Sequence, residues 1–259
     1  MNLQRPPYLI FAYYVGLIAL LYIPIAILFL FSINGNTALS FPLQGLTLSW
    51  YQKLFETPEV LAAARNSLIV AAASSLAATV LGTMVSILYL RYDFRLKGLL
   101  LALSVLPLIV PYVVLAVALL LLFSVLHIQR SLWTIGFAHT VIAVPYALLI
   151  ISSRLAGFDV HLEEAAMDLG ADYMVTLRRV VLPMIFPAIV AAWLTCFTVS
   201  FDEFALALFL AGTKPTFPVY LFSQLRFANR LPIMIALAVL LMIGTLTLVF
   251  AAERIQRAK

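Results

Sequence analysis

Long apolar runs separated by short polar segments occupy most of the chain. A helix needs about 20 apolar residues to cross the hydrocarbon core of a bilayer. Six runs reach that length, and none shows the alternation of apolar and polar positions that is typical of a strand. The runs lie roughly at residues 8–33, 67–90, 98–126, 132–152, 183–211 and 233–252. The pattern predicts an all-α membrane protein with six transmembrane helices, in which residues 1–259 form a single transmembrane domain.

Two of these runs have features that refine the prediction. The run 98–126 contains Pro107 and Pro111, and proline kinks or breaks a helix because it lacks a backbone donor. Such a break is tolerated in a membrane where the helix faces protein or a cavity. The run 8–33 is too long for the core of a signal peptide and lacks a small-residue cleavage site, so we expect it to remain as a helix.

Composition supports a membrane location and excludes a single soluble domain. Of the 259 residues, 64% are hydrophobic and only 10% are charged, whereas a soluble domain carries about 25% charged residues. The net charge is +5, but the basic residues are scattered at the edges of the apolar runs. This distribution indicates membrane topology and argues against nucleic-acid binding.

The basic residues also predict the orientation. If the N-terminus is cytoplasmic, the cytoplasmic segments hold ten of them and the opposite segments hold six. The first set is Arg5, Arg91, Arg95, Lys97, Arg154, Arg178, Arg179, Arg254, Arg257 and Lys259, and the second is Lys53, Arg65, Arg130, Lys214, Arg226 and Arg230. The positive-inside rule therefore favours both termini in the cytoplasm and places residues 153–182 in the longest cytoplasmic loop.

Cysteine and histidine give no sign of a metal or cofactor site. Cys196 is the only cysteine and lies inside an apolar run, where a lone cysteine usually acts as a small hydrophobic residue. His127, His139 and His161 are far apart in the sequence and have no partner at ligand spacing. We interpret them as loop or core residues and expect no metal and no cofactor in this chain.

Residues 153–182 form the most polar long segment of the chain. Residues 162–169 predict a short helix, and Gly170 suits the left-handed position that follows a helix C-terminus. Asp172 is then a suitable N-cap for a second helix. We expect that second helix to lie along the membrane surface and to lead into a membrane helix at Pro183, since proline is favoured near a helix start.

The first of these helices allows two interpretations. Its carboxylates Glu164 and Asp168 are four residues apart, while Ala165 and Ala166 keep one side slim. A slim, acidic and rigid helix suits insertion into a groove of a soluble partner. An ordinary solvated loop helix would show the same residues.

The spacing of this segment resembles the EAA motif of permeases from binding-protein-dependent ABC importers. That motif is Glu-Ala-Ala, three residues, Gly, nine residues, Ile, one residue and Leu-Pro. Here it corresponds to Glu164–Ala166, Gly170, Val180 and Leu182–Pro183, with Val in place of Ile. The resemblance implies a coupling helix that docks into a cleft of the ATPase subunit. The residues implied in coupling are Glu163, Glu164, Ala165, Ala166, Asp168, Leu169, Gly170 and Ala171.

Other segments resemble the spermidine/putrescine-type branch of the family, with PotC-like permeases most similar. These are Leu48–Phe55, Arg65–Leu68, Gly157–Asp159 and Phe197–Phe204. The resemblance implies a type I ABC importer permease fold in the inner membrane of a bacterium. It also implies a small cationic or amine-containing, polyamine-like solute. Another small solute, such as an amino acid derivative or an aminophosphonate, is the alternative within the same class.

The resemblance further implies the partners of the chain. These are a second permease subunit in a heterodimer, two ATPase subunits and a periplasmic solute-binding protein. The sequence has no Gly-x-x-x-x-Gly-Lys-Ser/Thr pattern, which binds the phosphates of ATP in P-loop proteins. ATP and Mg²⁺ are therefore expected to act in the partner ATPase, and this chain is expected to be a transport subunit.

Asp202 and Glu203 lie within the apolar run 183–211. Carboxylates at membrane depth cost several kcal/mol unless they are paired or face water. One interpretation is a structural tie, for example to Arg226 or Arg230. The other is an acidic station on the substrate pathway, with Trp193, Phe197, Phe201 and Phe204 on one helical stripe, because aromatic faces near carboxylates suit an ammonium group.

Two other classes of protein fit the composition. An intramembrane enzyme is disfavoured because neither His-Glu-x-x-His nor Gly-x-Ser-x-Gly occurs, and because the acidic pair has no histidine or serine partner evident from the sequence. An ion channel or a self-sufficient carrier would not need a segment with EAA-type spacing.

Overall fold

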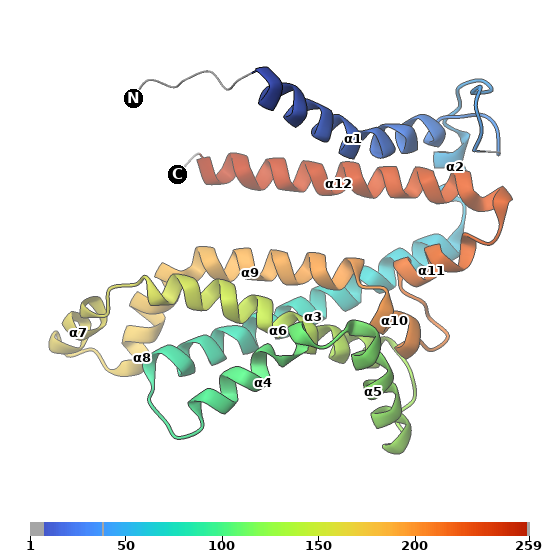
Figure 1. Ribbon diagram of the computed structural model, residues 1–259. Helices are drawn as coiled ribbons and strands as arrows, with labels where there is room; N and C mark the ends of the chain where they lie inside the picture. Colours follow the sequence, from blue (N-terminus) through green and yellow to red (C-terminus); the bar gives the residue numbers. More distant parts are fainter. Residues whose placement is uncertain (1–7, 38, 258–259) are drawn as a thin grey trace. The chain divides into compact units, whose positions relative to one another are not determined.

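The computed structural model of the protein describes residues 8–37 and 39–257, and every regular element in these ranges is a helix. The chain divides into two compact units (Figure 1). One unit contains residues 1–61 and 221–259, and the other contains residues 62–220. The all-α fold class expected from the apolar runs is confirmed.

The first unit contains both ends of the chain. Helix α1 (Tyr8–Ser32) and helix α2 (Ser49–Phe55) both pack against α12 (Leu231–Arg257). Trp50 of α2 is buried, and its Nε1 atom donates to the carbonyl of Asn34 at 2.7 Å. Trp50 is therefore part of the packing of this unit, since its indole N–H finds a partner inside it.

The second unit holds the helices that position the candidate site. Helices α6 and α9 lie side by side through most of their length (Figure 1). The elements are α3 (Pro58–Arg91) from Ala62 onward, α4 (Lys97–Ile109), α5 (Tyr112–Val125), α6 (Leu132–Ala156), α7 (His161–Asp168), α8 (Tyr173–Thr176), η1 (Leu177–Val181), α9 (Leu182–Asp202), α10 (Ala205–Leu210) and α11 (Phe217–Gln224) up to Tyr220.

Helix α6 lies at the centre of this unit and contributes to two buried clusters. One end packs with α3, α5 and α10 around Ile135, Ala138 and Ile142. The other end packs with α3, η1 and α9. Gly82 of α3 lies directly against Ala147 of α6, where an added Cβ would come within 2.5 Å of the alanine Cβ. Small residues at such a crossing let helix backbones approach closely, as is common in membrane proteins.

The helix lengths bear out part of the predicted membrane topology. Within the described residues, four helices are long and apolar enough to cross a bilayer, and the bent pair α4 and α5 makes a fifth candidate. The predicted break is confirmed at Pro111, where α4 and α5 are bent by 110°, whereas Pro107 lies inside α4 and does not end it. The sixth predicted run, 233–252, falls in α12. A shorter apolar helical stretch, Ala228–Gly244, includes the first part of this helix. Most side chains of that run after Gly244 are not described, so six crossings remain a prediction.

Two boundaries differ from the expectation. The run 183–211 is not one helix, since α9 ends at Asp202 and Glu203 is extended, with φ −70° and ψ 123°. The helix that begins at Tyr173 does not end before Pro183. It continues through the π-helical segment η1 into α9, giving one apolar helical stretch of 30 residues.

Candidate functional site

Helix α7 ends in a Schellman motif built around Gly170. The N–H of Gly170 donates to the carbonyl of Met167 at 2.9 Å, and that of Ala171 donates to Ala166 at 3.1 Å. These are the two hydrogen bonds that define the motif. Gly170 has φ +89°, a region that costs other L-residues strain. The predicted left-handed position of Gly170 is therefore confirmed.

The second predicted cap in this segment is also present. Oδ1 of Asp172 accepts a hydrogen bond from the N–H of Val175 at 2.6 Å, so Asp172 is the N-cap of α8. The Schellman motif and the N-cap together fix the turn between α7 and α8. The short helix α7 is consequently presented in a defined direction.

The two faces of α7 differ sharply. Glu164, Ala165 and Asp168 are exposed, and Leu169 just beyond the helix is 91% exposed. Glu163 is instead only 7% exposed and is paired with Arg91. Among the predicted coupling residues, Glu163 therefore faces the interior of the protein. Glu164, Ala165 and Asp168 face outward, and Leu169 adds an exposed apolar side chain beside them.

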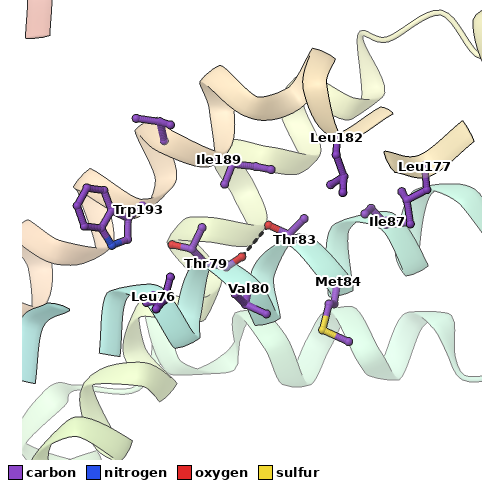
Figure 2. A pocket seen from close by; sticks show the side chains of 11 residues that line it. Leu76, Thr79, Val80, Thr83, Met84, Ile87, Leu177, Leu182, Ile189 and Trp193 are labelled. Carbon is purple, nitrogen blue, oxygen red and sulfur yellow. Dashed lines mark hydrogen bonds between the residues drawn. The ribbon is translucent and has the colours of Figure 1, made fainter. Parts of the chain in front are cut away.

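A hollow of about 490 Å³ lies between α3, η1 and α9. Figure 2 shows side chains from α3 facing those of the opposite wall, with Thr83 donating to the backbone of Thr79 at 2.7 Å. The lining residues are Leu76, Thr79, Val80, Thr83, Met84, Ile87, Leu177, Leu182, Ile189, Val190 and Trp193. Of the predicted pathway residues, Trp193 lines this hollow, whose walls carry no charge.

The acidic pair is split by the end of α9. Asp202 is exposed, and no hydrogen bond or ion pair to its side chain is found within the described chain. Glu203 is only 6% exposed, and its Oε2 atom accepts from the N–H groups of Leu206 and Ala207 at 2.9 and 3.2 Å. Glu203 thus supplies acceptors for the otherwise unpaired N–H groups that begin α10.

Glu203 also belongs to a buried polar cluster. Nε2 of His139 lies 3.4 Å from Oε2 of Glu203, and Nδ1 of His139 is 2.8 Å from Oγ of Ser200. Ser200 in turn bonds to Ser74 of α3 at 2.8 Å. The structure therefore corrects the view that the acidic pair lacks a histidine or serine partner. Glu203 has a structural tie, as one interpretation expected, but to His139 and the backbone of α10.

The cluster contains serine, histidine and glutamate but does not have the geometry of a hydrolase. In the Ser-His-Asp arrangement the nucleophile bonds to Nε2 and the acid to Nδ1, whereas the order here is reversed. All of these side chains are also nearly inaccessible, with exposures of 1% to 6%. The cluster fits a polar contact that fastens α3, α6 and α9 together.

Aromatic side chains form a ladder along α9. The ring centroids of Trp193 and Phe197 are 6.2 Å apart, and those of Phe197 and Phe201 are 6.0 Å apart. Phe201 then stacks on Phe217 at 6.5 Å. The predicted stripe is therefore present for its first three members. Phe204 lies beyond the end of α9 at Asp202, so it is not part of the same helical stripe.

Sequence reasoning missed Arg91, His139 and Ser200. Arg91 was noted only as a basic residue of a loop, and its partner Glu163 is 72 residues away. His139 carried the more useful signal, since a lone polar side chain within an apolar run needs a buried partner. The identity of that partner depends on the packing of α6 against α9, which is not visible in either run.

Comparison with known proteins supports the family resemblance. Residues 78–259 match the family of the "Binding-protein-dependent transport system inner membrane component". The spermidine/putrescine transport system permease protein PotC of Escherichia coli (strain K12) is 36% identical over 242 residues, 93% of this chain and 91% of PotC. The putrescine transport system permease protein PotI of the same strain is 35% identical over 214 residues, 80% of this chain and 76% of PotI.

The fold has a counterpart among solved structures. It is similar to a chain in the crystal structure of a bacterial ABC transporter involved in the import of the acidic polysaccharide alginate. The TM-score is 0.73 with 95% of each chain covered, at 18% sequence identity. This likeness shows an ABC importer permease fold. Together with the family match, it establishes that the chain belongs to the multi-pass inner membrane permease components of binding-protein-dependent ABC transport systems.

Proposed function

We propose that this permease forms one half of the membrane pathway of an ATP-driven importer for a small cationic amine of the polyamine class. The observation that carries the proposal is the similarity, over 93% of the chain, to a permease named for spermidine and putrescine. The fold alone does not select this solute, since the solved relative with the same fold belongs to a transporter of an acidic polysaccharide.

The end of α9 supports a cationic solute. Asp202 is an exposed carboxylate without a partner in the described chain, and it directly follows Phe201, the third ring of the ladder. A carboxylate beside aromatic faces attracts ammonium groups by charge and by cation–π interaction. We assign the acidic station to Asp202, with Trp193, Phe197 and Phe201 beside it. Glu203 supports this site indirectly, because its carboxylate accepts the first N–H groups of α10 directly after the end of α9.

The exposed side of α7 supports docking to a soluble partner. Helix α7 and the turn after it are fixed by caps at Gly170 and Asp172. They carry the predicted coupling residues Glu164, Ala165, Ala166, Asp168, Leu169, Gly170 and Ala171. A nearly fully exposed leucine beside carboxylates suits a partner groove with an apolar floor and a basic rim. We propose that this partner is the ATPase subunit and that α7 is the coupling helix.

The family implies an ATPase and a binding protein as partners, and we propose the composition. One copy of this chain pairs with a second permease subunit, two ATPase subunits dock on the cytoplasmic side, and a periplasmic protein delivers the solute. ATP and Mg²⁺ act in the ATPase. We further propose that residues 1–259 act as one transmembrane domain, with both termini and residues 153–182 in the cytoplasm.

Uptake by the complete transporter tests the proposal. The chain is expressed with its second permease, ATPase and binding protein in cells that lack polyamine uptake, and entry of labelled putrescine and spermidine is followed. Uptake should require the ATPase and should be competed by other diamines but not by neutral solutes of similar size. An assembled complex that imports neither amine would refute the solute class, and uptake without the ATPase would refute the mechanism.

A further inference from the structure

An ion pair joins α7 to the end of α3. The Nε atom of Arg91 donates to Oε1 of Glu163 at 2.8 Å, and Nη2 of Arg91 lies 2.7 Å from the same oxygen. The guanidinium carbon of Arg91 is also 5.8 Å from the ring centroid of Phe158. One arginine therefore contacts both α7 and the segment that leads into it.

The burial of this pair distinguishes it from the exposed ion pairs Lys97–Asp93 and His161–Glu164. The side chains of Arg91 and Glu163 are 15% and 9% exposed, whereas the acidic partner in the Lys97–Asp93 pair is 98% exposed. Breaking a buried pair leaves an uncompensated charge, whereas an exposed pair contributes little. The Arg91–Glu163 pair therefore holds α7 in one position relative to α3.

A second contact reinforces the attachment. Tyr92, the residue after Arg91, packs edge-on against Tyr173 at the start of α8, with ring centroids 6.0 Å apart. The end of α3 thus contacts both helices that flank Gly170. A movement of the α7–α8 turn would therefore carry the end of α3 with it.

Arg91 also ends the side of α3 that lines the apolar hollow. Val80, Met84 and Ile87 face the hollow, and Arg91 follows at the next i+4 position, on the same side of the helix. The opposite wall, η1 and α9, continues directly from α8 along the backbone. Both walls of the hollow are consequently attached to the α7–α8 turn, one by covalent continuity and one by the ion pair.

The far end of α3 is fastened to the neighbourhood of Asp202. Asn66 donates to the carbonyl of Pro215 at 3.0 Å, and Oγ of Ser67 accepts from the N–H of Phe217 at 2.8 Å. Phe217 stacks on Phe201, which precedes Asp202. The rise between Ser67 and Arg91 is about 36 Å at 1.5 Å per residue, so α3 spans about the thickness of the hydrocarbon core.

We propose that Arg91 and Glu163 are the positioning pair that transmits movement of α7 to α3, and through α3 to the residues around Asp202. This inference rests on the proposed role of α7 as the coupling helix. The pair stays closed during the transport cycle and makes α3 and α9 respond together. Without it, movement would reach the end of α3 only through the Tyr92–Tyr173 contact and the distant Ser74–Ser200 bond, and α3 would follow α7 incompletely.

Charge reversal in the complete transporter, reconstituted in vesicles, tests the inference. The measured quantity is the number of ATP molecules hydrolysed per solute imported, together with the amount of assembled complex. Arg91→Glu or Glu163→Arg should raise that number about tenfold, within the range of typical coupling free energies. The double variant Arg91→Glu/Glu163→Arg should recover at least half of the lost coupling. Lys97→Glu and Asp93→Lys disrupt the nearby exposed Lys97–Asp93 pair and should leave the ratio unchanged.

Opposite results would overturn the inference. Single variants with the wild-type ratio, or a double variant no better than either single one despite normal assembly, would show that the pair transmits nothing. A second measurement applies if charge reversal prevents assembly. In the variant Arg91→Cys/Glu163→Cys, bridging the two thiols with a short bifunctional reagent should restore coupling, and bridged complexes that stay uncoupled would refute a closed link.

The test of α7 itself remains separate. Substitution of Gly170 alters the turn presented to the ATPase and is assayed by cross-linking to that subunit. If α7 cross-links to the ATPase and Gly170 variants lose transport while Arg91 variants remain coupled, the proposed function stands and only the transmission through α3 is refuted. If α7 does not contact the ATPase at all, the proposed function fails first.

Discussion

Asp202 and Glu203 are adjacent in sequence but have opposite environments. Asp202 ends α9 with an exposed side chain, whereas Glu203 is buried and bonds the first N–H groups of α10. A continuous helix would place the two side chains about 100° apart around one helix axis. The end of the helix at Asp202 instead gives each carboxylate its own role, and the two roles predict different effects of mutation.

Neutralising Asp202 should slow uptake without harming the protein. Asp202→Asn keeps the shape and removes the charge, so a cationic solute loses the attraction of a nearby carboxylate. We expect uptake of putrescine per assembled transporter to fall about tenfold, as for loss of about 1.4 kcal/mol. Thr198→Ala, at another exposed position of α9, should have no such effect. Unchanged normalised uptake in Asp202→Asn would remove the acidic station from the proposed mechanism.

Truncating Glu203 should act on stability. Glu203→Ala leaves the N–H groups of Leu206 and Ala207 without their acceptor and removes the carboxylate that lies beside the ring of His139. A buried unsatisfied polar group costs about 1–3 kcal/mol. Less assembled transporter and a lower unfolding temperature in detergent should result. Glu203→Gln retains an oxygen acceptor and should be milder. Loss of uptake in Glu203→Ala with normal stability would assign Glu203 to the substrate pathway instead.

The contrast between these carboxylates shows what the sequence could not predict. No proline or glycine lies between Asp202 and Ala205, so nothing local marks the end of α9. The break is stabilised by Glu203 folding back on α10 and by His139, which is 64 positions earlier in the chain. Such contacts depend on how α6 packs against α9, and a single sequence does not contain that packing.

The α7–α8 turn was predictable because its determinants are local. Gly170 and Asp172 each act on backbone groups within about four residues, so residue type and spacing are enough to predict both caps. The orientation of α7 was not predictable in the same way. Which of its carboxylates faces inward depends on Arg91 at the end of α3, and the acidic spacing alone treats Glu163 and Glu164 alike.

Gly170 should tolerate only residues that accept a positive φ. Gly170→Val forces a β-branched residue to φ +89°, and left-handed backbone costs non-glycine residues about 1–2 kcal/mol. We expect cross-linking of α7 to the ATPase and solute uptake to fall together. Gly157→Ala is the matched control, because Gly157 ends α6 with φ −84° and has room for a Cβ.

The variant Gly170→Asn distinguishes two requirements for glycine at position 170, a left-handed backbone and the absence of a side chain. Asparagine accepts left-handed backbone more readily than other side chains, and nothing in the described chain lies within 4 Å of the position of a Cβ at residue 170. Normal uptake in Gly170→Asn would mean that only the conformation matters. Loss of uptake would indicate close approach of the ATPase surface. Normal uptake in Gly170→Val as well would contradict the coupling assignment of this turn.

His161 should titrate above its ordinary range. Its Nδ1 atom lies 2.8 Å from Oε2 of Glu164, and this hydrogen bond, followed by the charges of Asp159 and Glu164, raises the pKa of His161. Because the folded-state pKa is raised, the pair stabilises α7 fully below about pH 6.5, and the contribution is lost as the pH rises through the raised pKa. NMR titration should show a lower His161 pKa in Glu164→Gln, and equal values would disprove the pairing.

The orientation can be tested at the two ends of α6. Arg130 precedes this helix and Arg154 lies in its last turn, and both are exposed. The only native cysteine, Cys196, is fully buried, so each introduced cysteine supplies the reactive thiol. In intact cells an impermeant reagent should label Arg130→Cys, and it should label Arg154→Cys only after the membrane is opened.

The expected labelling pattern follows from the length of α6 and from the distribution of basic residues along the chain. Helix α6 has 25 residues, about 37 Å at 1.5 Å per residue, which is enough to cross the hydrocarbon core. Its two ends are then expected on opposite sides, and the excess of basic residues predicts that Arg154 and the α7–α8 turn lie in the cytoplasm. The reverse labelling pattern would invert the chain and put α7 where no ATPase can reach it. Labelling of both positions from outside would instead mean that α6 does not span the membrane.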